Sequence, residues 1–250
     1  MHKLPPQLLG SKRPQLFSGL TEASLQKLLT YAVTQEHGPN HILVQQGDIP
    51  DGVYLVLEGE VRTLRSNEGG EEASIRLLEV GDTCMEAVLF MSGPSPISVQ
   101  SLTQSRVMMI PARIIKQHVL DDSHFALNII SIVSHHYRNA MHQIDAMNIK
   151  TPLQRVGYYF LEKHLEAGHD SLEFTLPFRK QTVANYLGIT AETFSRVLKQ
   201  MRDLGISVEN DTIRMKDAFS LCHFCDSDTE ALCDRKDKDN CKHCIMHSKG

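Results

Sequence analysis

The chain has 250 residues, a formal net charge of −4, 41 % hydrophobic residues and 22 % charged residues. This composition is ordinary for a soluble globular protein of one or two domains. No apolar run approaches about 20 residues, and the first 15 residues lack a continuous apolar segment, so the sequence predicts neither a membrane span nor a secretory signal. We therefore expect a cytoplasmic protein, in which the six cysteines indicate metal or redox chemistry before structural disulfides.

Residues 1–120 are predicted to form a β-rich domain. A short helix over 17–32 comes first and carries Leu25, Leu28 and Leu29 inward. Short β runs separated by glycine turns follow, and such a series closes as an antiparallel sandwich or jelly roll. The fold class expected for the whole chain is α+β. The β runs span 42–48, 52–61, 74–82, 97–102 and 106–111.

Residues 121–150 predict one long dimerisation helix. Its apolar positions alternate steps of three and four residues, which is the a/d seam of a coiled coil. The alternative is a single helix that packs its stripe on its own sensor domain. Thr151 and Pro152 then end this helix and start another over 153–164. The seam consists of Ile130, Val133, Tyr137, Met141, Ile144 and Asn148.

Residues 151–220 predict a winged helix-turn-helix domain that binds DNA. A short helix from Lys180, a turn at Gly188 and a second helix capped by Thr190 have the required spacing. The second helix has an apolar stripe for the core and a polar face whose residue types read base edges: arginine bonds guanine, a carboxylate accepts from cytosine, and serine does either. An ordinary solvated helix has the same pattern, but five basic residues against one acid between 179 and 202 favour DNA. The β runs 206–208 and 213–215 flank a turn and predict the wing. The candidate DNA-binding residues are Arg179, Lys180, Thr190, Glu192, Ser195, Arg196 and Lys199.

Residues 221–250 are a cysteine-rich tail with the spacing C-x2-C-x7-C-x7-C-x2-C. The outer pairs have zinc-site spacing, and thiolates suit zinc or an iron–sulfur cluster equally. A disulfide pair or reactive thiols are the alternatives. Because the intervening residues are polar and charged, we expect the tail to need a metal or a partner to fold. The candidate ligands are Cys222, Cys225, Cys233, Cys241 and Cys244, of which Cys233 is the one that a four-ligand site would leave spare.

The helix-turn-helix resembles a known family. Residues 176–178, followed by KQTVANYLGITAETFSRVLKQM, resemble the DNA-binding domain of the CRP/FNR superfamily of bacterial transcription regulators. Within this run, Glu192 to Arg196 is similar to the E-x-x-S-R motif of the FNR and DNR branch. The resemblance, which extends over the β region to about residues 15–220, implies a homodimer that reads a TTGAT-like palindrome and acts with RNA polymerase. No catalytic motif stands out, so an enzyme is not expected.

The sensor region departs from the cAMP-binding pattern of this family. Glu86 occupies the position of the family's glutamate, but Met85 replaces the preceding glycine, and Pro96 and Ile97 stand where an Arg-Ser pair would hold the phosphate. A buried phosphate without its arginine would be an uncompensated anion, so we predict no cAMP binding. Residues 85–91 resemble the DNR-type regulators, which respond to nitric oxide.

The resemblance also bears on the cofactor. Oxygen-sensing FNR proteins hold an oxygen-labile [4Fe-4S] cluster, usually on N-terminal cysteines, but no cysteine precedes Cys84, which we expect to be a buried apolar residue. A subset of the family places the cluster cysteines at the C-terminus, and this tail is similar. We therefore expect a cluster that responds to oxygen, nitric oxide or redox state. One alternative is structural zinc in the tail together with a DNR-like haem sensor. Conceivable haem ligands are His135, His136 and His142, although most such histidines are surface residues. The other alternative is a tail that recruits a protein partner.

Overall fold

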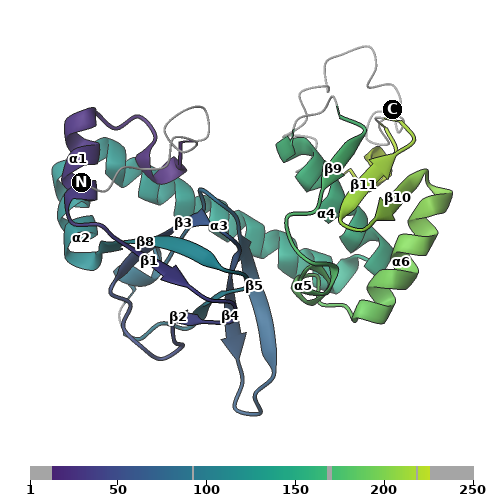
Figure 1. Cartoon of the computed structure of the whole chain (residues 1–250), viewed down its shortest axis with the longest axis horizontal. Helices are drawn as coiled ribbons and strands as arrows, with labels where there is room; N and C mark the ends of the chain where they lie inside the picture. Colours follow the sequence, from purple (N-terminus) through teal and green to yellow (C-terminus); the bar gives the residue numbers. More distant parts are fainter. Residues whose placement is uncertain (1–12, 92, 168–170, 218, 226–250) are drawn as a thin grey trace. The chain divides into compact units, whose positions relative to one another are not determined.

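The computed structural model describes residues 13–91, 93–167, 171–217 and 219–225. The chain divides into two compact units, Met1–Met141 and His142–Gly250. The division falls inside the longest helix, α3 (Ser123–Ile149), which contributes to both units (Figure 1). Within the described residues, none of the helices has the length and apolarity that spanning a membrane requires.

The first unit contains two four-stranded sheets in which every strand pairs antiparallel to its neighbours, so the predicted roll is confirmed (Figure 1). One sheet has the order β1-β8-β3-β6 and the other β2-β7-β4-β5. Short strands joined by glycine-containing turns favour this closure. The strands are β1 (Val33–His37), β2 (Ile42–Val44), β3 (Gly52–Glu58), β4 (Val61–Ser66), β5 (Glu72–Leu78), β6 (Thr83–Cys84), β7 (Ser98–Ser101) and β8 (Ser105–Pro111).

Strand β3 is buried on both faces, because it separates two apolar clusters. Val53, Leu55 and Leu57 face the helices α1 (Glu22–Thr30), α2 (Ala112–Asp121) and the first turns of α3. Tyr54 and Val56 face the interior of the roll, between the two sheets. The period-two alternation of this strand therefore distributes apolar side chains to two cores rather than to a core and to solvent.

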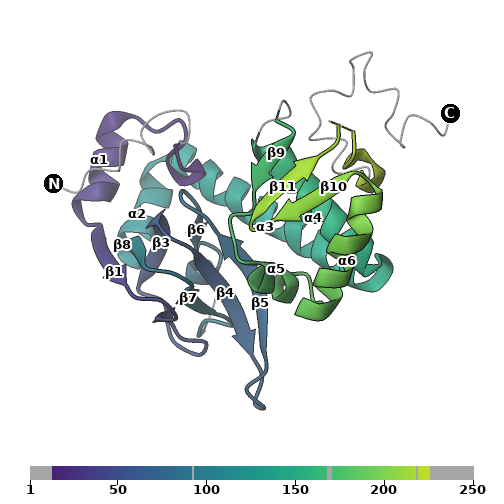
Figure 2. The same ribbon diagram turned by 45° about the vertical axis from the view of Figure 1, so that its right-hand side comes forward.

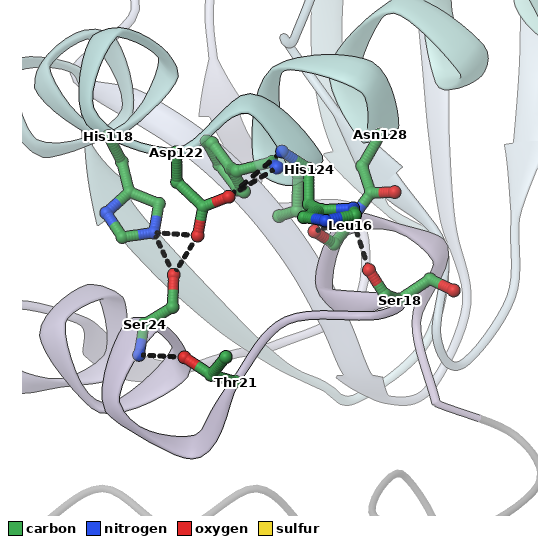
Figure 3. Close-up of polar contacts among 9 residues, drawn as sticks. Leu16, Ser18, Thr21, Ser24, His118, Asp122, His124 and Asn128 are labelled. Carbon is green, nitrogen blue, oxygen red and sulfur yellow. Dashed lines mark hydrogen bonds and ion pairs between the residues drawn. The ribbon is translucent and has the colours of Figure 1, made fainter.

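A buried polar cluster ties the three helices of this unit together (Figure 3). His118 Nε2 lies 2.7 Å from Ser24 Oγ, and the Ser24 hydroxyl donates to Asp122 Oδ2. The other carboxylate oxygen of Asp122 accepts from the backbone N–H of His124 at 3.0 Å and of Phe125 at 3.2 Å, which caps α3. The Ser24 hydrogen bond lowers the pKa of Asp122, and burial lowers the pKa of His118. Ser24 and Asp122 both approach Nε2 of His118, whereas in a catalytic triad serine and aspartate contact different ring nitrogens. The cluster therefore stabilises the packing of the helices and has no catalytic arrangement.

The second unit contains the end of α3, a second helix and a winged helix-turn-helix, as expected from the sequence (Figure 2). Phe160, Phe178 and Phe194 are all buried in it. A three-stranded sheet has the order β10-β11-β9, and Asn210, with φ of 52°, makes the turn of the wing. The elements are α4 (Pro152–Ala167), β9 (Glu173–Thr175), α5 (Lys180–Tyr186), α6 (Ala191–Asp203), β10 (Ile206–Glu209), β11 (Thr212–Met215) and the 3-10 turn η4 (Cys222–Phe224).

Three local expectations need correction. The first helix begins at Glu22, after its Thr21 cap, rather than at residue 17, since residues 15–17 form a separate 3-10 turn. The long helix begins at Ser123 rather than 121, because α2 ends at Asp121. Helix α2 and strands β1 and β9 were not expected at all. Helix α2 packs its apolar side on the core, and β1 and β9 acquire their conformation by pairing with β8 and β11.

Candidate nucleic-acid interface

Helix α6 is fixed in place by its cap and by its apolar side. The Thr190 hydroxyl accepts from the backbone N–H of Thr193 at 3.1 Å, so it satisfies one donor that the first turn leaves unpaired. Phe194, Val197 and Met201 are buried beneath the helix. The sequence predicted this start correctly and placed the stripe on Phe194, Val197, Leu198, Met201 and Leu204, of which Leu198 and Leu204 are only partly buried.

The opposite face of α6 is polar and open. Glu192, Ser195, Arg196 and Lys199 are all exposed. Glu192 and Arg196 form an ion pair of 3.5 Å one turn apart, with side chains 81 % and 65 % exposed. Such an exposed pair contributes only about 0.3–0.5 kcal/mol, so either partner can exchange it for a base at low cost.

The remaining candidate residues flank this face. Arg179 is the N-cap residue of α5 and is exposed, and Lys180 begins that helix. Arg202 lies in the last turn of α6, where its charge is favourable to the helix dipole. Five basic residues of the second unit therefore lie on or next to the two helices of the helix-turn-helix, where they could contact phosphates.

The wing holds charged residues that the sequence analysis did not single out. Arg214 on β11 lies 2.9 Å from Glu173 of β9 and also pairs with Glu209 of β10. These ion pairs span all three strands of the small sheet. They link the wing to the rest of the sheet, and both glutamates and the arginine are largely exposed.

Comparison with known proteins supports this interface. Residues 34–122 match the family "Cyclic nucleotide-binding domain", and residues 154–224 match "Crp-like helix-turn-helix domain". The "Anaerobic regulatory protein" of Pasteurella multocida is 28 % identical over 187 residues, 73 % of this chain and 68 % of its own length. The "Cyclic AMP receptor protein" of Thermus thermophilus is 26 % identical over 211 residues, 84 % of this chain and 96 % of its own. The structure of FixK2 from Bradyrhizobium japonicum has the same fold, with a TM-score of 0.69, 20 % identity and coverage of 78 % of this chain and 98 % of that one.

The chain belongs to the Crp/Fnr family of transcription regulators. Regulators of this family bind DNA, are not enzymes and generally act as dimers. The absence of catalytic motifs noted in the sequence agrees with this. The polar face of α6 is accordingly the candidate surface for binding DNA, and α3 is the candidate surface for contact with a second subunit.

Helix α3 has two neighbouring apolar faces, one buried and one exposed. Phe125, Ile129 and Ile132 are buried against the β-roll and its helices. The seam expected from the sequence lies beside them and is open: Ile130 is 60 % exposed and Tyr137 is 67 % exposed. The helix therefore does pack on its own sensor unit, but through a different stripe, and it leaves most of the expected seam available.

The first unit contains a buried carboxyl group. Glu86 is 1 % exposed, and its Oε1 has no hydrogen-bond partner among the residues that the structure describes. Burial raises its pKa, while Arg76 and a hydrogen bond with Thr83 act in the opposite direction. Arg76 itself donates to the Thr83 carbonyl at 3.2 Å. The sequence analysis missed this arginine because Arg76 lies on β5 and Glu86 follows β6, which belong to different sheets, so their proximity follows from tertiary packing and not from a motif.

The histidines of α3 lie in different surroundings. His136 is partly buried, and burial, followed by Arg76 and His135, lowers its pKa to about 3. His135 contacts Asn139 at 3.1 Å, and the ring of His142 stacks on Tyr158 at 6.0 Å between centroids. Among the described residues, no three His, Cys, Asp or Glu side chains gather where they could hold a metal ion. The expectation of a haem site on these histidines stays a prediction.

The cysteine tail is described only at its start. Cys222 and Cys225 flank the turn η4, in which the Cys225 N–H donates to the Cys222 carbonyl at 3.1 Å. Both are partly exposed, whereas Cys84 is buried as expected. Phe224 between them packs on Gly157 of α4, where an added Cβ would lie 2.3 Å from the ring. The first C-x2-C pair is therefore anchored on the DNA-binding unit; the predicted ligands Cys233, Cys241 and Cys244 lie outside the described residues.

Proposed function

We propose that this regulator binds a TTGAT-like palindrome as a homodimer in the cytoplasm, with RNA polymerase as a further partner. The observation that carries the proposal is the open face of α6. Glu192, Ser195 and Arg196 stand there in the first turns of a helix whose other side is buried, and these residue types can accept from cytosine or donate to guanine. Arg179, Lys180 and Lys199 supply charge for the phosphates beside these bases.

The open seam of α3 supports the dimer. Ile130, Tyr137 and Ile144 are each at least half exposed, and large apolar side chains in a row favour burial against an identical helix. A homodimer with twofold symmetry would also match a palindromic site. Sedimentation of the whole chain and of an Ile130→Glu, Ile144→Glu double variant tests this step, because only the double variant is expected to be monomeric.

We further propose that the tail holds an iron–sulfur cluster that responds to oxygen, nitric oxide or redox state. The tight turn that brings Cys222 and Cys225 together suits two thiolate ligands of one metal centre. Cys241 and Cys244 would complete the set, with Cys233 as a fifth cysteine. When bound, a cluster supplies the gas-sensitive iron. The contribution of the described residues is to attach this centre to α4 through Phe224.

We also propose that cAMP is not the signal. The positions of Pro96 and Ile97 offer no cation for a cyclic phosphate, and Arg76 is already engaged with the Thr83 carbonyl and lies beside Glu86. Calorimetry with cAMP is expected to show no binding in the micromolar range. Micromolar binding would show that another cation, Arg76 first, serves the phosphate.

The deciding experiment is anaerobic purification followed by an absorption spectrum and analysis of iron, sulfide and zinc, before and after exposure to air and nitric oxide. A brown protein with about four irons per subunit that bleaches would support the cluster. A colourless protein with about one zinc would make the tail structural and favour a haem-type sensor in the β-roll. Cys225→Ser is expected to lose the metal, and Cys84→Ala is the matched control because Cys84 is buried in the roll.

The DNA step is tested separately, by fluorescence anisotropy on a TTGAT palindrome and on a scrambled duplex of equal composition. Tighter binding to the palindrome is expected, with a ratio that persists as salt is raised even though both affinities fall. Equal affinity for the two duplexes would contradict the proposed base reading.

A further inference from the structure

We propose that Arg155 is a positioning residue that locks the helix-turn-helix to the end of the long helix α3. This inference rests on the proposed function, since it concerns how a dimer would hold its two recognition helices at a fixed separation. It assigns that task to one side chain in α4, which no DNA-reading motif includes.

The guanidinium of Arg155 makes three hydrogen bonds to three backbone carbonyls. Its Nε donates to Lys150 at 3.1 Å, one terminal nitrogen donates to Met147 at 3.2 Å, and the other donates to Leu187 at 3.2 Å. The first two carbonyls belong to the last turn of α3 and the residue after it. The third belongs to the C-cap residue of α5, three residues before the Thr190 cap of α6.

These carbonyls are natural partners for an arginine. The last carbonyls of a helix have no acceptor role inside the helix, and they form the negative end of its dipole. Arg155 places one positive charge between two such ends. Only a planar guanidinium can donate in three directions from a fixed fork, whereas a lysine ammonium is a single point at the end of a flexible stem.

Side-chain packing at the same place adds a second contact. Gly188, with φ of 64°, makes the turn between α5 and α6. A Cβ added there would lie 3.5 Å from the terminal methyl of Met147 and 3.7 Å from a terminal nitrogen of Arg155. The turn of the helix-turn-helix therefore lies directly against the final turn of α3. Arg155 donates hydrogen bonds to backbone carbonyls on both sides of this contact.

The consequence concerns the geometry of DNA binding. Two recognition helices must enter successive major grooves about 34 Å apart to read both halves of a palindrome. If α3 pairs the subunits, the separation depends on how rigidly α6 is held to the end of α3. A firm junction makes the dimer selective for one half-site spacing, and a loose junction makes it tolerant of several.

Two variants and one control test the role of Arg155. Arg155→Gln removes the charge and cannot reach three carbonyls, while Arg155→Lys keeps the charge but not the fork. Arg113→Gln is the control because it removes one positive charge from α2 in the other unit. Thermal unfolding of each variant shows whether the fold is retained.

The first measurement uses no DNA. Spin labels at Asp145 on α3 and Gln200 on α6, both exposed, report the distance between these helices. They are introduced as non-natural amino acids, since the chain has cysteines of its own, and the labelled chain is diluted with unlabelled chain. We expect a narrow distance distribution in the wild type and the Arg113→Gln control, and a broad one in both Arg155 variants. A distance distribution of unchanged width in Arg155→Gln would overturn the proposal. A distribution as narrow as that of the wild type in Arg155→Lys would show that the three hydrogen bonds of the guanidinium are not required, and would overturn that part of the proposal.

The second measurement compares affinities for a palindrome with the best half-site spacing and for palindromes lengthened by one or two base pairs. The ratio of the affinity for the best spacing to the affinity for a lengthened palindrome should fall by about 5- to 150-fold in the Arg155 variants. This is the usual range for energetic coupling within a protein. An equal loss on all spacings would assign Arg155 to general stability and overturn the proposal. If the wild type fails to prefer any palindrome over a scrambled duplex, the proposed function fails, and the distance measurement still decides the role of Arg155.

Discussion

Glu192 and Glu86 show how the two units use the same side chain in opposite ways. Glu192 on α6 is 81 % exposed and is paired with Arg196 across one helical turn. Glu86 in the β-roll is 1 % exposed, and burial raises its pKa. The exposed glutamate can exchange partners at little cost, so it suits a surface that must bind and release DNA. The buried one is held by fixed surroundings, so its protonation depends on the residues packed around it.

The largest effect should follow from the loss of Arg196. In Arg196→Ala the bidentate contact with a guanine disappears, and specific binding to the palindrome is expected to weaken by about 1–3 kcal/mol. Non-specific, salt-sensitive binding should be largely kept, and the free energy of unfolding should change by less than about 0.5 kcal/mol because the side chain is exposed. Anisotropy titrations on palindromic and scrambled duplexes measure both.

The control for this variant is Arg113→Ala in the sensor unit, which changes the net charge equally. It should leave the ratio of the two affinities unchanged. An identical loss on the palindrome and the scrambled duplex in Arg196→Ala would mean that Arg196 contacts only phosphates.

The next effect concerns the buried polar cluster of the sensor unit. Ser24→Ala leaves Asp122 Oδ2 and His118 Nε2 without their shared partner, and the free energy of unfolding should fall by about 1–3 kcal/mol. Ser131→Ala is the matched control, since its hydroxyl makes an exposed hydrogen bond with Gln15 and should cost little. Urea unfolding measures the free energy of unfolding of the two variants. Similar decreases in both would show that the burial of the Ser24 hydrogen bonds is unimportant.

The sequence was most informative where the pattern is local. The apolar stripe of Phe194, Val197 and Met201, the Thr190 cap and the turn at Gly188 all lie within 14 residues, and the structure confirms them. The same is true of most strands of the roll and of its glycine turns, although β1 was missed. Local periodicity is sufficient there, because side chains three or four positions apart on a helix share a face in any fold.

The sequence was uninformative where contacts join distant segments. Ser24 and His118 are 94 residues apart, and Arg155 and Leu187 are 32 apart. No spacing rule connects such positions, since their proximity follows from how the helices pack. An arginine in the first turns of α4 reads as a surface charge, and only the neighbouring helix ends show what it binds.

A moderate effect is expected at Glu86. Because burial raises its pKa, the folded chain retains this proton above about pH 4.5, where the unfolded chain releases it. The free energy of unfolding should therefore fall as pH rises through that window. In Glu86→Gln this fall should be smaller, and the variant should be more stable than the wild type at neutral pH by on the order of 1 kcal/mol. Unfolding at several pH values measures this, with exposed Glu36→Gln as the control; parallel pH profiles for wild type and Glu86→Gln would contradict it.

The smallest effect on stability is expected at Glu192, where the same substitution should act with the opposite sign. Glu192→Gln removes the ion pair with Arg196 and a negative charge from the first turn of α6, which together should cost about 0.5 kcal/mol. The substitution should change base preference at one position only. A carboxylate only accepts hydrogen bonds and so favours the amino group of cytosine, whereas an amide both donates and accepts and favours cytosine less strictly. Binding to operators substituted at each position should show relaxed preference at a single base pair per half-site. If Glu192→Gln instead stabilised the chain as Glu86→Gln is expected to do, the contrast between the exposed and the buried glutamate would fail.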